Sequence, residues 1–354
     1  MTRRVSRQIS VGGICIGGNA PITVQSMTNT DTRDAAATIA QIRRLAEAGC
    51  EIVRCAVPDM AAVRALSEIK AASPIPVVAD IHFNYQLAIE AIAAGVDKIR
   101  INPGNIGGQD RVRAVVRACR AAGVPIRIGV NSGSVERELH ERYPDDLPRA
   151  MAESAMRHVQ MLEAEDFTDI CVSLKASDVP STIAAYRNMA ERCDYPLHLG
   201  VTHAGTLRMG TLKGAAGIGG LLAMGIGDTI RVSLAADPVQ EVAAGLDILR
   251  AVGIRRDRPE VIACPTCGRC QVDLLPLAEQ VEAAVSDLHV PIKIAVMGCA
   301  VNGPGEGREA DIGVACGRAD GLLFKNGEIL HKVPFDKIIP ALKALANEFV
   351  NGDQ

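Results

Sequence analysis

The 354-residue chain contains no tryptophan, and aromatic residues make up only 3% of it. Few side chains are therefore available for stacking on bases or sugars. Basic residues are not in excess either, since 38 Lys and Arg against 41 Asp and Glu give a formal net charge of −3. Proteins that bind nucleic acids or membrane surfaces are more often basic, so the composition disfavours both kinds of partner.

Long apolar segments are missing as well. The least polar stretch, residues 214–227, is short and rich in glycine, so we do not expect it to span a bilayer. The basic N-terminal residues are not followed by an apolar run, and we therefore expect no secretory signal. These features predict a cytoplasmic protein.

Cysteine, by contrast, is abundant, with 11 residues. In the cytoplasm these thiols should be reduced, and clusters among them should bind metal or react. Four cysteines form such a cluster in the last part of the chain: Cys264, Cys267, Cys270 and Cys299. We interpret the others as small apolar core residues, namely Cys15, Cys50, Cys55, Cys119, Cys171, Cys193 and Cys316.

One pattern recurs in the first 250 residues: a helical segment, a small residue, a glycine and then a β-branched run. Its clearest copies begin at Ala46, Ile92 and Arg120. The glycine suits the position that follows a helix, and the apolar run is typical of a parallel strand covered on both faces. We expect eight such strands: Thr23–Ser26, Glu51–Cys55, Pro76–Asp80, Lys98–Asn102, Ile126–Val130, Asp169–Lys175, Leu197–Thr202 and Thr229–Ser233.

Helical patterns separate these strands, for example over Thr38–Ala48 and Pro238–Val252. Eight strand–helix units predict a (β/α)8 TIM barrel over residues 1–252. A doubly wound open sheet is the alternative, but the first strand is not followed by the sequence G-x-G-x-x-G. Residues 6–20 resemble a hairpin that would close the bottom of the barrel.

A polar linker, residues 253–260, is expected to precede a small α+β domain over residues 261–354. The apolar patterns there predict two strands, a hairpin that turns at Asn326-Gly327, and two helices. The expected strands are Val261–Ala263 and Ile292–Val296, the hairpin is Gly321–Val333, and the helices are Leu274–Ala284 and Asp336–Phe349.

Basic residues occur near the carboxyl ends of several expected strands, where barrel enzymes have their active sites. Arg54 and Arg100 follow the repeat glycine by five residues and Arg127 by four, and Lys175 ends the sixth strand. Cations that share one barrel mouth repel each other unless an anion lies among them, and guanidinium groups match phosphate oxygens. We therefore expect a phosphate or diphosphate site.

The alternative is that these cations form ion pairs at the rim of the barrel, with Asp80 or Asp237 as partners. The loops at residues 102–105 and 131–134 are rich in Asn, Gly and Ser. Such loops can offer backbone N–H groups to an anion, but they are also ordinary turns between strands and helices.

The cysteine cluster has the spacing C-x2-C-x2-C, with Cys299 following 29 residues after Cys270. Thiolates at such spacing are ligands for an iron–sulfur cluster or for zinc, and the spacing does not distinguish the two. A thioredoxin-like dithiol of Cys264 and Cys267 is a third alternative, but it would not require Cys299 or the segment 302–306.

Ten segments together identify a family. They are VQSMTNTDTRD from Val24, VRCAVPD from Val53, ADIHFN from Ala79, RINPGN from Arg100, RIGVNSGS from Arg127, SLKASD from Ser173, HLGVTHAG from His198, GIGDTIRVSLAADP from Gly225, CPTC from Cys264 and GCAVNGPGE from Gly298. In this order, and over essentially the whole chain, they resemble the bacterial 4-hydroxy-3-methylbut-2-enyl diphosphate synthases.

This resemblance implies a TIM-barrel domain joined to an iron–sulfur domain. It implies an enzyme of non-mevalonate isoprenoid biosynthesis that reductively opens the ring of 2-C-methyl-D-erythritol 2,4-cyclodiphosphate, with flavodoxin or ferredoxin as electron donor. It also implies a homodimer, in which the cluster of one subunit lies over the barrel of the other. A non-redox barrel enzyme with structural zinc and a non-catalytic iron–sulfur carrier are the rival hypotheses.

The resemblance also assigns residues. Cys264, Cys267 and Cys299 match the thiolate ligands of a [4Fe–4S] cluster and Glu306 matches the fourth ligand, which leaves Cys270 without a role. The residues that match the family's substrate site are Arg54, Arg100, Arg127, Lys175, Asn131, Ser233, Asp80 and His82.

One position departs from the family pattern. The family usually reads Thr-Glu-Ala-Gly where this chain reads Thr202-His203-Ala204-Gly205. His203 thus replaces a glutamate implicated in catalysis. Since a histidine can also donate a proton near neutral pH, we expect His203 to be the acid here.

Overall fold

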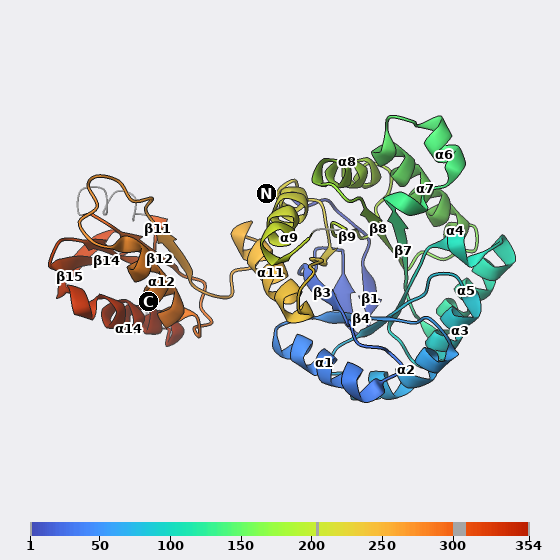
Figure 1. Ribbon diagram of the computed structural model, residues 1–354, viewed down its shortest axis with the longest axis horizontal. Helices are drawn as coiled ribbons and strands as arrows, with labels where there is room; N and C mark the ends of the chain where they lie inside the picture. The colour runs from blue at the N-terminus through green and yellow to red at the C-terminus, as the bar shows by residue number, and fades with distance from the viewer. Residues whose placement is uncertain (1, 203–204, 300–308, 353–354) are drawn as a thin grey trace. The chain divides into compact units, whose positions relative to one another are not determined.

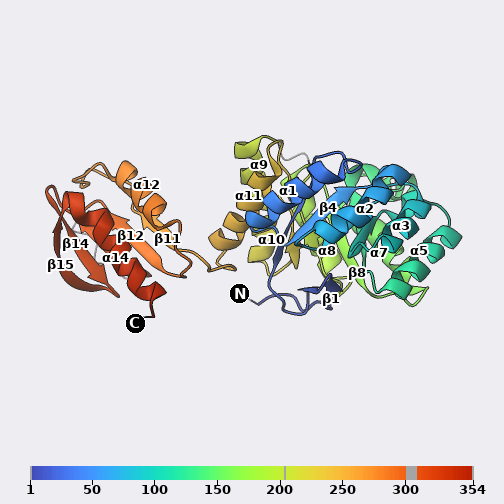
Figure 2. The ribbon, with the colours of Figure 1, turned by 90° about the horizontal axis from the view of Figure 1, so that it is seen from below.

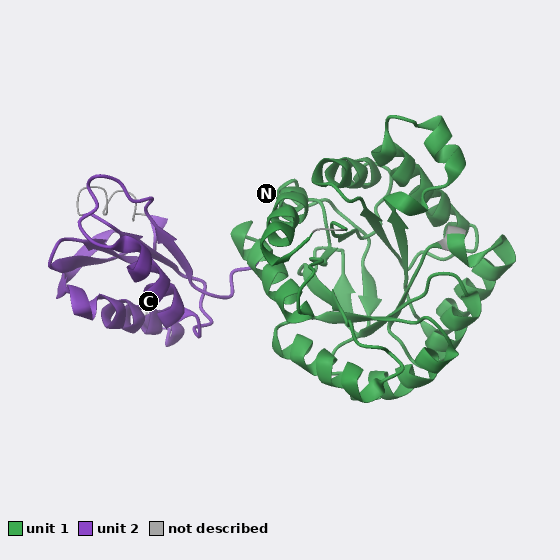
Figure 3. Cartoon of the chain, in the orientation of Figure 1, with its two compact units in different colours: residues 1–254 green, residues 255–354 purple. Residues whose placement is uncertain are grey.

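The computed structural model describes residues 2–202, 205–299 and 309–352. The chain forms two compact units, residues 1–254 and residues 255–354 (Figure 3). The boundary between them lies in the polar stretch that follows Val252. None of the helices in the described part combines the length and apolar character needed to cross a membrane.

The first unit is an eight-stranded parallel barrel with helices around it, which confirms the predicted fold class (Figure 1). Neighbouring strands follow the order β8-β7-β6-β5-β4-β3-β10-β9, and a parallel bridge between Val172 and Leu197 joins the two ends of this order. The strands are β3 (Thr23–Met27), β4 (Ile52–Ala56), β5 (Val77–Asp80), β6 (Lys98–Ile101), β7 (Ile126–Asn131), β8 (Ile170–Lys175), β9 (His198–Leu199) and β10 (Thr229–Ile230).

The helices of this unit begin at residues that suit helix starts. Asp59, Asp146 and Asp178 each accept a hydrogen bond from a backbone N–H of the first turn, which is the usual N-cap arrangement. The helices are α1 (Ala35–Glu47), α2 (Met60–Ala72), α3 (Tyr85–Ala93), α4 (Pro103–Ile106), α5 (Gln109–Ala122), α6 (Arg137–Arg142), α7 (Leu147–Glu163), α8 (Val179–Ala190), α9 (Leu207–Gly214), α10 (Gly220–Ala223) and α11 (Pro238–Ala251).

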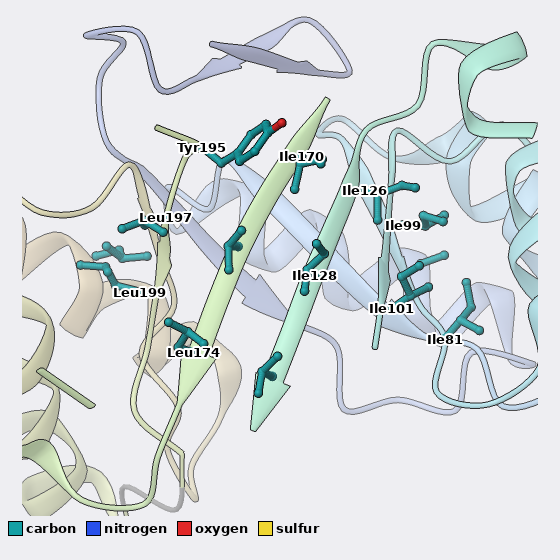
Figure 4. Packing of buried hydrophobic residues seen from close by; sticks show 14 of the residues in the cluster. Ile81, Ile99, Ile101, Ile126, Ile128, Ile170, Leu174, Tyr195, Leu197 and Leu199 are labelled. Carbon is teal, nitrogen blue, oxygen red and sulfur yellow. The ribbon is translucent and has the colours of Figure 1, made fainter. Parts of the chain in front are cut away.

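The barrel strands alternate between an apolar outer face and a largely polar inner face. Ile99, Ile101, Ile126 and Ile128 are fully buried in the main hydrophobic cluster beneath the helices (Figure 4). The residues between them in sequence are basic or small. The apolar runs expected from the sequence therefore form the outer face, whereas the inner face is apolar mainly where Ile52, Val78 and Cys171 meet the N-terminal hairpin.

A hairpin packs against the strand beginnings at the bottom of the barrel (Figure 2). Its strands, β1 (Ile9–Val11) and β2 (Ile14–Ile16), pair antiparallel, and the turn residues Gly12 and Gly13 both have positive φ. Ile9, Val11 and Ile16 form an apolar cluster with barrel residues that include Ile52 and Val78. The hairpin predicted for residues 6–20 is thus present, and its apolar side meets the lowest layer of the barrel interior.

The second unit is a five-stranded sheet in the order β11-β12-β13-β14-β15, with two long helices. The sequence did not predict β13, because Gly313 interrupts its apolar pattern. A Cβ at Gly313 would lie 2.3 Å from the Phe324 ring, so only glycine fits at this position. The strands are β11 (Glu260–Ala263), β12 (Lys293–Met297), β13 (Ile312–Cys316), β14 (Asp320–Lys325) and β15 (Glu328–Pro334), and the helices are α12 (Leu274–Val285) and α14 (Ile338–Val350).

Asp228 fixes the N-terminal segment to the barrel. Its carboxylate accepts hydrogen bonds from the Ser6 hydroxyl at 2.7 Å and the Leu197 backbone N–H at 2.8 Å. Arg3 and Arg4 lie 3.4 and 3.6 Å from it, and the Asp228 side chain is only 3% exposed. Removing this carboxylate takes the acceptor from the Ser6 hydroxyl and the Leu197 N–H and the counter-charge from Arg3 and Arg4, which keep only backbone carbonyl partners.

Replacing Asp228 with alanine should therefore lower the free energy of unfolding of the barrel by about 3–5 kcal/mol. Chemical denaturation followed by circular dichroism measures this loss. Asp194→Ala is the matched control, since Asp194 makes a 2.8 Å ion pair with Arg7 but both side chains are about half exposed. Its loss should cost no more than about 0.5 kcal/mol, and equal losses in the two variants would contradict the role assigned to Asp228.

Candidate functional site

The structure brings the four expected basic residues together inside the barrel. Arg54 lies on β4, Arg100 on β6, Arg127 on β7 and Lys175 at the end of β8. Each occupies an inward-facing position of its strand, and their exposed fractions are 7, 7, 1 and 6%. Buried cations this close together need an anion, and the one that the strands themselves supply is Asp80.

Asp80, the last residue of β5, lies between two of these arginines. Its carboxylate is 3.1 Å from Arg100 Nη1 and 3.5 Å from Arg54 Nε. Burial alone would raise the pKa of Asp80, but the charge of Arg54, the nearby His82 side chain and the charge of Arg100 lower it below its ordinary value. The rim ion pair with Asp80 is therefore present, whereas Asp237 pairs with Arg44 at 2.7 Å on the outside.

Arg127 and Lys175 make no ion pair with any described carboxylate. Arg127 is the second residue of β7 and lies deeper than a rim position, with Nη1 3.5 Å from the Gln25 side-chain oxygen. Burial and the charge of Arg100 lower the pKa of Arg127 to about 10. Burial, followed by the charges of Arg54 and other arginines, lowers the pKa of Lys175 well below its ordinary value. An anion in the barrel mouth would stabilise both cations.

The sequence analysis missed a further cation, Arg231, which directly follows β10. Its guanidinium donates to both oxygens of the buried Glu241 carboxylate at 3.0 Å. Glu241 also accepts from the Ser26 hydroxyl and the Leu234 backbone N–H, so several donors fix its position. A sequence signal existed, because Arg231 follows Gly227 by four residues, as Arg127 follows Gly123.

Two glycines leave the space that the basic side chains occupy. A Cβ at Gly129 on β7 would lie 2.4 Å from Arg100 Nε, and a Cβ at Gly200 would lie 2.8 Å from Lys175 Nζ. Neither glycine has the positive φ that would otherwise explain it. Both glycines leave room for a cationic side chain, and a larger residue at either position would force Arg100 or Lys175 to move.

The other expected substrate residues lie at the barrel mouth or outside the described residues. His82 is exposed, with Nε2 3.7 Å from the Asp80 carboxylate, while Asn131 ends β7 and Ser233 follows β10. His203 lies outside the described residues. A cavity of about 300 Å³ opens beside Asp80 and His82, and the rest of its lining is Ala56, Val57, Pro58, Phe83, Asn84 and Leu87.

Parallel strands bring the cysteine motifs of the second unit together. Cys264 follows β11, and its sulfur accepts a hydrogen bond from the Gly298 N–H at 3.3 Å, directly before Cys299. Hydrogen bonds from the backbone and then the side chain of Arg269 lower the pKa of the exposed Cys267 thiol. The Cys270 thiol donates to the Val272 carbonyl.

Within residues 2–202, 205–299 and 309–352, no three His, Cys, Asp or Glu side chains are grouped closely enough to hold a metal ion. Glu306, the expected fourth ligand, lies outside these ranges. What the described part supplies is therefore a pair of neighbouring strand ends that carry Cys264 and Cys299, and a loop that carries Cys267.

Both units match family models along nearly their whole length. Residues 6–246 match the model described as the GcpE TIM-barrel domain, and residues 260–348 match the GcpE protein C-terminal domain. The chain belongs to the GcpE family. Among the curated relatives of this family, the protein of Geobacter sulfurreducens is 58% identical over 339 residues, which cover 96% of each chain. That of Brevibacillus brevis is 55% identical and covers 99% of this chain and 97% of its own.

Both of these GcpE relatives are named 4-hydroxy-3-methylbut-2-en-1-yl diphosphate synthase (flavodoxin). More distant structures share only the barrel. The 3-dehydroquinate dehydratase of Geobacillus kaustophilus superposes with a TM-score of 0.50 at 13% identity, covering 71% of this chain and 99% of its own. A truncated 3-deoxy-D-arabino-heptulosonate 7-phosphate synthase of Thermotoga maritima gives the same score and identity over 70% of this chain and 94% of its own.

The tight contact at Gly129 generates a prediction about Arg100. Gly129→Ala should displace the Arg100 guanidinium and weaken the binding of inorganic pyrophosphate to the full chain by about ten- to hundredfold, since one charge-assisted hydrogen bond contributes about 1.5–3 kcal/mol. Isothermal titration calorimetry measures the affinity. The matched control is Gly133→Ala in the loop after β7, where an added Cβ would meet no atom within 4 Å. Equal affinities in the two variants would show that Gly129 does not position Arg100.

Proposed function

We propose that this protein reductively opens the ring of 2-C-methyl-D-erythritol 2,4-cyclodiphosphate and forms 4-hydroxy-3-methylbut-2-enyl diphosphate. The observation that carries this proposal is the cluster of buried cations inside the barrel, whose charge exceeds that of the carboxylates beside it. A diphosphate is the ligand that such a site binds best. Family membership and the names of the relatives agree with this chemistry.

In this proposal the diphosphate lies among Arg54, Arg100, Arg127 and Lys175, with Asn131, Ser233, Asp80 and His82 as further contacts. Arg127 and Lys175 have no described carboxylate partner, so the substrate supplies the charge that they lack. Asp80 restrains Arg54 and Arg100 before the substrate arrives, which reduces the entropy lost on binding. The barrel thus contributes positioning and electrostatic stabilisation.

The second unit would hold a [4Fe–4S] cluster through Cys264, Cys267, Cys299 and Glu306. The donor chemistry fits this group, because thiolates are the usual ligands of such clusters and backbone N–H groups already point at the Cys264 and Cys267 sulfurs. When bound, the cluster supplies the two electrons of the reaction, one at a time. A carboxylate is a harder ligand for iron than a thiolate and exchanges more readily. Glu306 would therefore be the most readily exchanged of the four ligands.

The overall step consumes two electrons and two protons. The ring C–O bond breaks, the diphosphate oxygen stays with the phosphate, and one hydroxyl group leaves as water as the double bond forms. The residues of the barrel hold the diphosphate throughout, so the charge released onto it at ring opening develops beside cations that are already in place. His203 is proposed to donate the proton to the departing oxygen.

The electron donor is proposed to be flavodoxin or ferredoxin, and the names of the relatives support flavodoxin. We further propose a cytoplasmic homodimer, in which the cluster unit of one subunit covers the barrel of the other. The reduced state of the thiols that the cluster needs supports a cytoplasmic location.

The experiment that tests this function is anaerobic turnover. The protein is purified without oxygen, its iron, acid-labile sulfide and zinc are measured, and the cyclodiphosphate is supplied with a chemical reductant. The proposal expects about four iron and four sulfide per chain together with formation of the linear diphosphate. Zinc in place of iron would favour a non-redox barrel enzyme, and an intact cluster without turnover would favour an electron carrier.

A prediction on the cluster ligands compares Glu306→Ala with Cys270→Ser. Glu306→Ala should retain much of the cluster absorbance, because three thiolates still hold it, but should lose turnover. Cys270→Ser should retain both. Absorbance, iron content and anaerobic activity are measured on each variant. Loss of the cluster in Cys270→Ser, together with an active Glu306→Ala, would mean that four cysteines form the site and that Glu306 is not a ligand.

A second prediction concerns the proton donor. If His203 is the acid, the rate should fall as pH rises through the pKa of this histidine, which is about 6.5 in an unperturbed residue. A pH–rate profile of the native chain is compared with those of His203→Glu and His203→Ala. Full activity and an unchanged profile in His203→Ala would show that the proton comes from another group, whereas a sharply higher rate in His203→Glu would mark the native chain as impaired.

A further inference from the structure

A further buried cation, Lys98, lies deeper in the barrel than the arginines. Lys98, the first residue of β6, is two residues before Arg100 and therefore faces the same side of the strand, about 7 Å deeper. Its side chain is completely buried. Val78, its partner in the register of β5 and β6, belongs to the apolar cluster that the β1–β2 hairpin forms with Ile52 and Cys171. Lys98 is thus enclosed between an apolar plug and the guanidinium groups above.

The Lys98 ammonium has no hydrogen-bond partner among the described residues, and neither do Arg127 Nε or the two ring nitrogens of the buried His198. The charged and titratable groups that act on Lys98 are Arg127 on β7, Arg54 on β4 and the Cys171 thiol on β8, and Lys98 in turn acts on His198 of β9. None of them is a carboxylate. The neighbouring Asp97 faces the outside, where it pairs with Lys70 at 2.9 Å.

We propose that Lys98 strengthens the binding of the diphosphate through its charge alone, from a layer that the substrate does not touch. This inference rests on the proposed function, because it takes the anion to be the diphosphate in the layer of Arg54, Arg100 and Lys175. A cation enclosed without a partner destabilises the fold, since burial removes its hydration and nothing replaces it. Its field, however, is less screened in the buried barrel interior than in water and acts on the anion bound among the arginines.

The size of the effect follows from Coulomb's law. At about 10 Å and an effective dielectric constant of about 20, one unit charge changes the affinity for a singly charged anion by about tenfold. A diphosphate carries more than one charge, so tenfold is the lower end of the expected change. Removal of the charge should therefore weaken anion binding and stabilise the empty protein at the same time.

The ionisation of Lys98 adds a pH signature. Burial, and then the charge of Arg127 against the opposing influence of Cys171, lowers the pKa of Lys98 to about 8. The cost of the buried charge is complete below pH 8 and is relieved as pH rises from about 8 towards 10.5, the value of an unfolded lysine. Anion affinity in the native protein should fall over the pH range in which the ammonium loses its proton.

The test uses the full chain and inorganic pyrophosphate as the probe, and compares Lys98→Met with Lys70→Met. Both variants lose one positive charge, but Lys70 lies on the outer surface. Lys98→Met should bind pyrophosphate at least about tenfold more weakly at pH 7 and should melt a few degrees higher than the native chain. Its melting advantage should shrink above pH 8, and Lys70→Met should bind pyrophosphate as the native chain does.

Unchanged pyrophosphate affinity in a folded Lys98→Met would overturn the inference, and so would an equal loss of affinity in Lys70→Met, which would indicate net charge alone. If Lys98→Met does not fold, pyrophosphate affinity is measured on the native chain as a function of pH. An affinity that stays constant as pH rises through 8 would contradict the proposal. These outcomes do not test the proposed function. The proposed function would fail if the native protein bound pyrophosphate but did not open the cyclodiphosphate ring.

Discussion

The main physical constraint on the barrel is that several positive charges are buried together inside it. Arg54, Arg100, Arg127 and Lys175 are all at least nine-tenths buried, and Asp80 balances only part of their charge. Such an arrangement destabilises the folded state of the empty protein, and a bound anion removes part of this destabilisation. Its stability must therefore come from elsewhere in the fold.

The outer face of the strands and the plug below them supply that stability. The apolar residues between strands and helices form one continuous cluster around the barrel, and the hairpin closes the bottom with an apolar layer of its own. The rest of the inner face can then carry charged side chains. Gly129 and Gly200 contribute no side-chain packing, but the space that they leave is occupied by Arg100 and Lys175.

Much of the fold could be predicted from the sequence because its signals are local. The glycine that ends a helix and the β-branched run after it identified the barrel strands, and Asn326-Gly327, both with positive φ in the structure, identified a hairpin turn. Strand β13 was missed because Gly313 is required by a contact with Phe324 on another strand, and no local pattern contains that information.

The site could be predicted only in part for a similar reason. Spacing after a glycine identified Arg54, Arg100 and Arg127 as one set, but the depth of each side chain depends on strand register, which the sequence does not encode locally. The same spacing would have identified Arg231 had it been applied to the last strand. The ion pairs with Asp80 were one alternative that the sequence left open, whereas the pairing of Arg231 with Glu241 is a tertiary property that no local pattern shows.

The central claim is that the barrel interior is a diphosphate site built at the expense of stability, and ligand-dependent melting of the native chain tests it most directly. Saturating pyrophosphate should raise the melting temperature, since a ligand at 100 times its Kd stabilises the folded state by about 2.7 kcal/mol. Sodium chloride at equal ionic strength should not. A melting temperature that responds equally to both salts, or to neither, would contradict the claim.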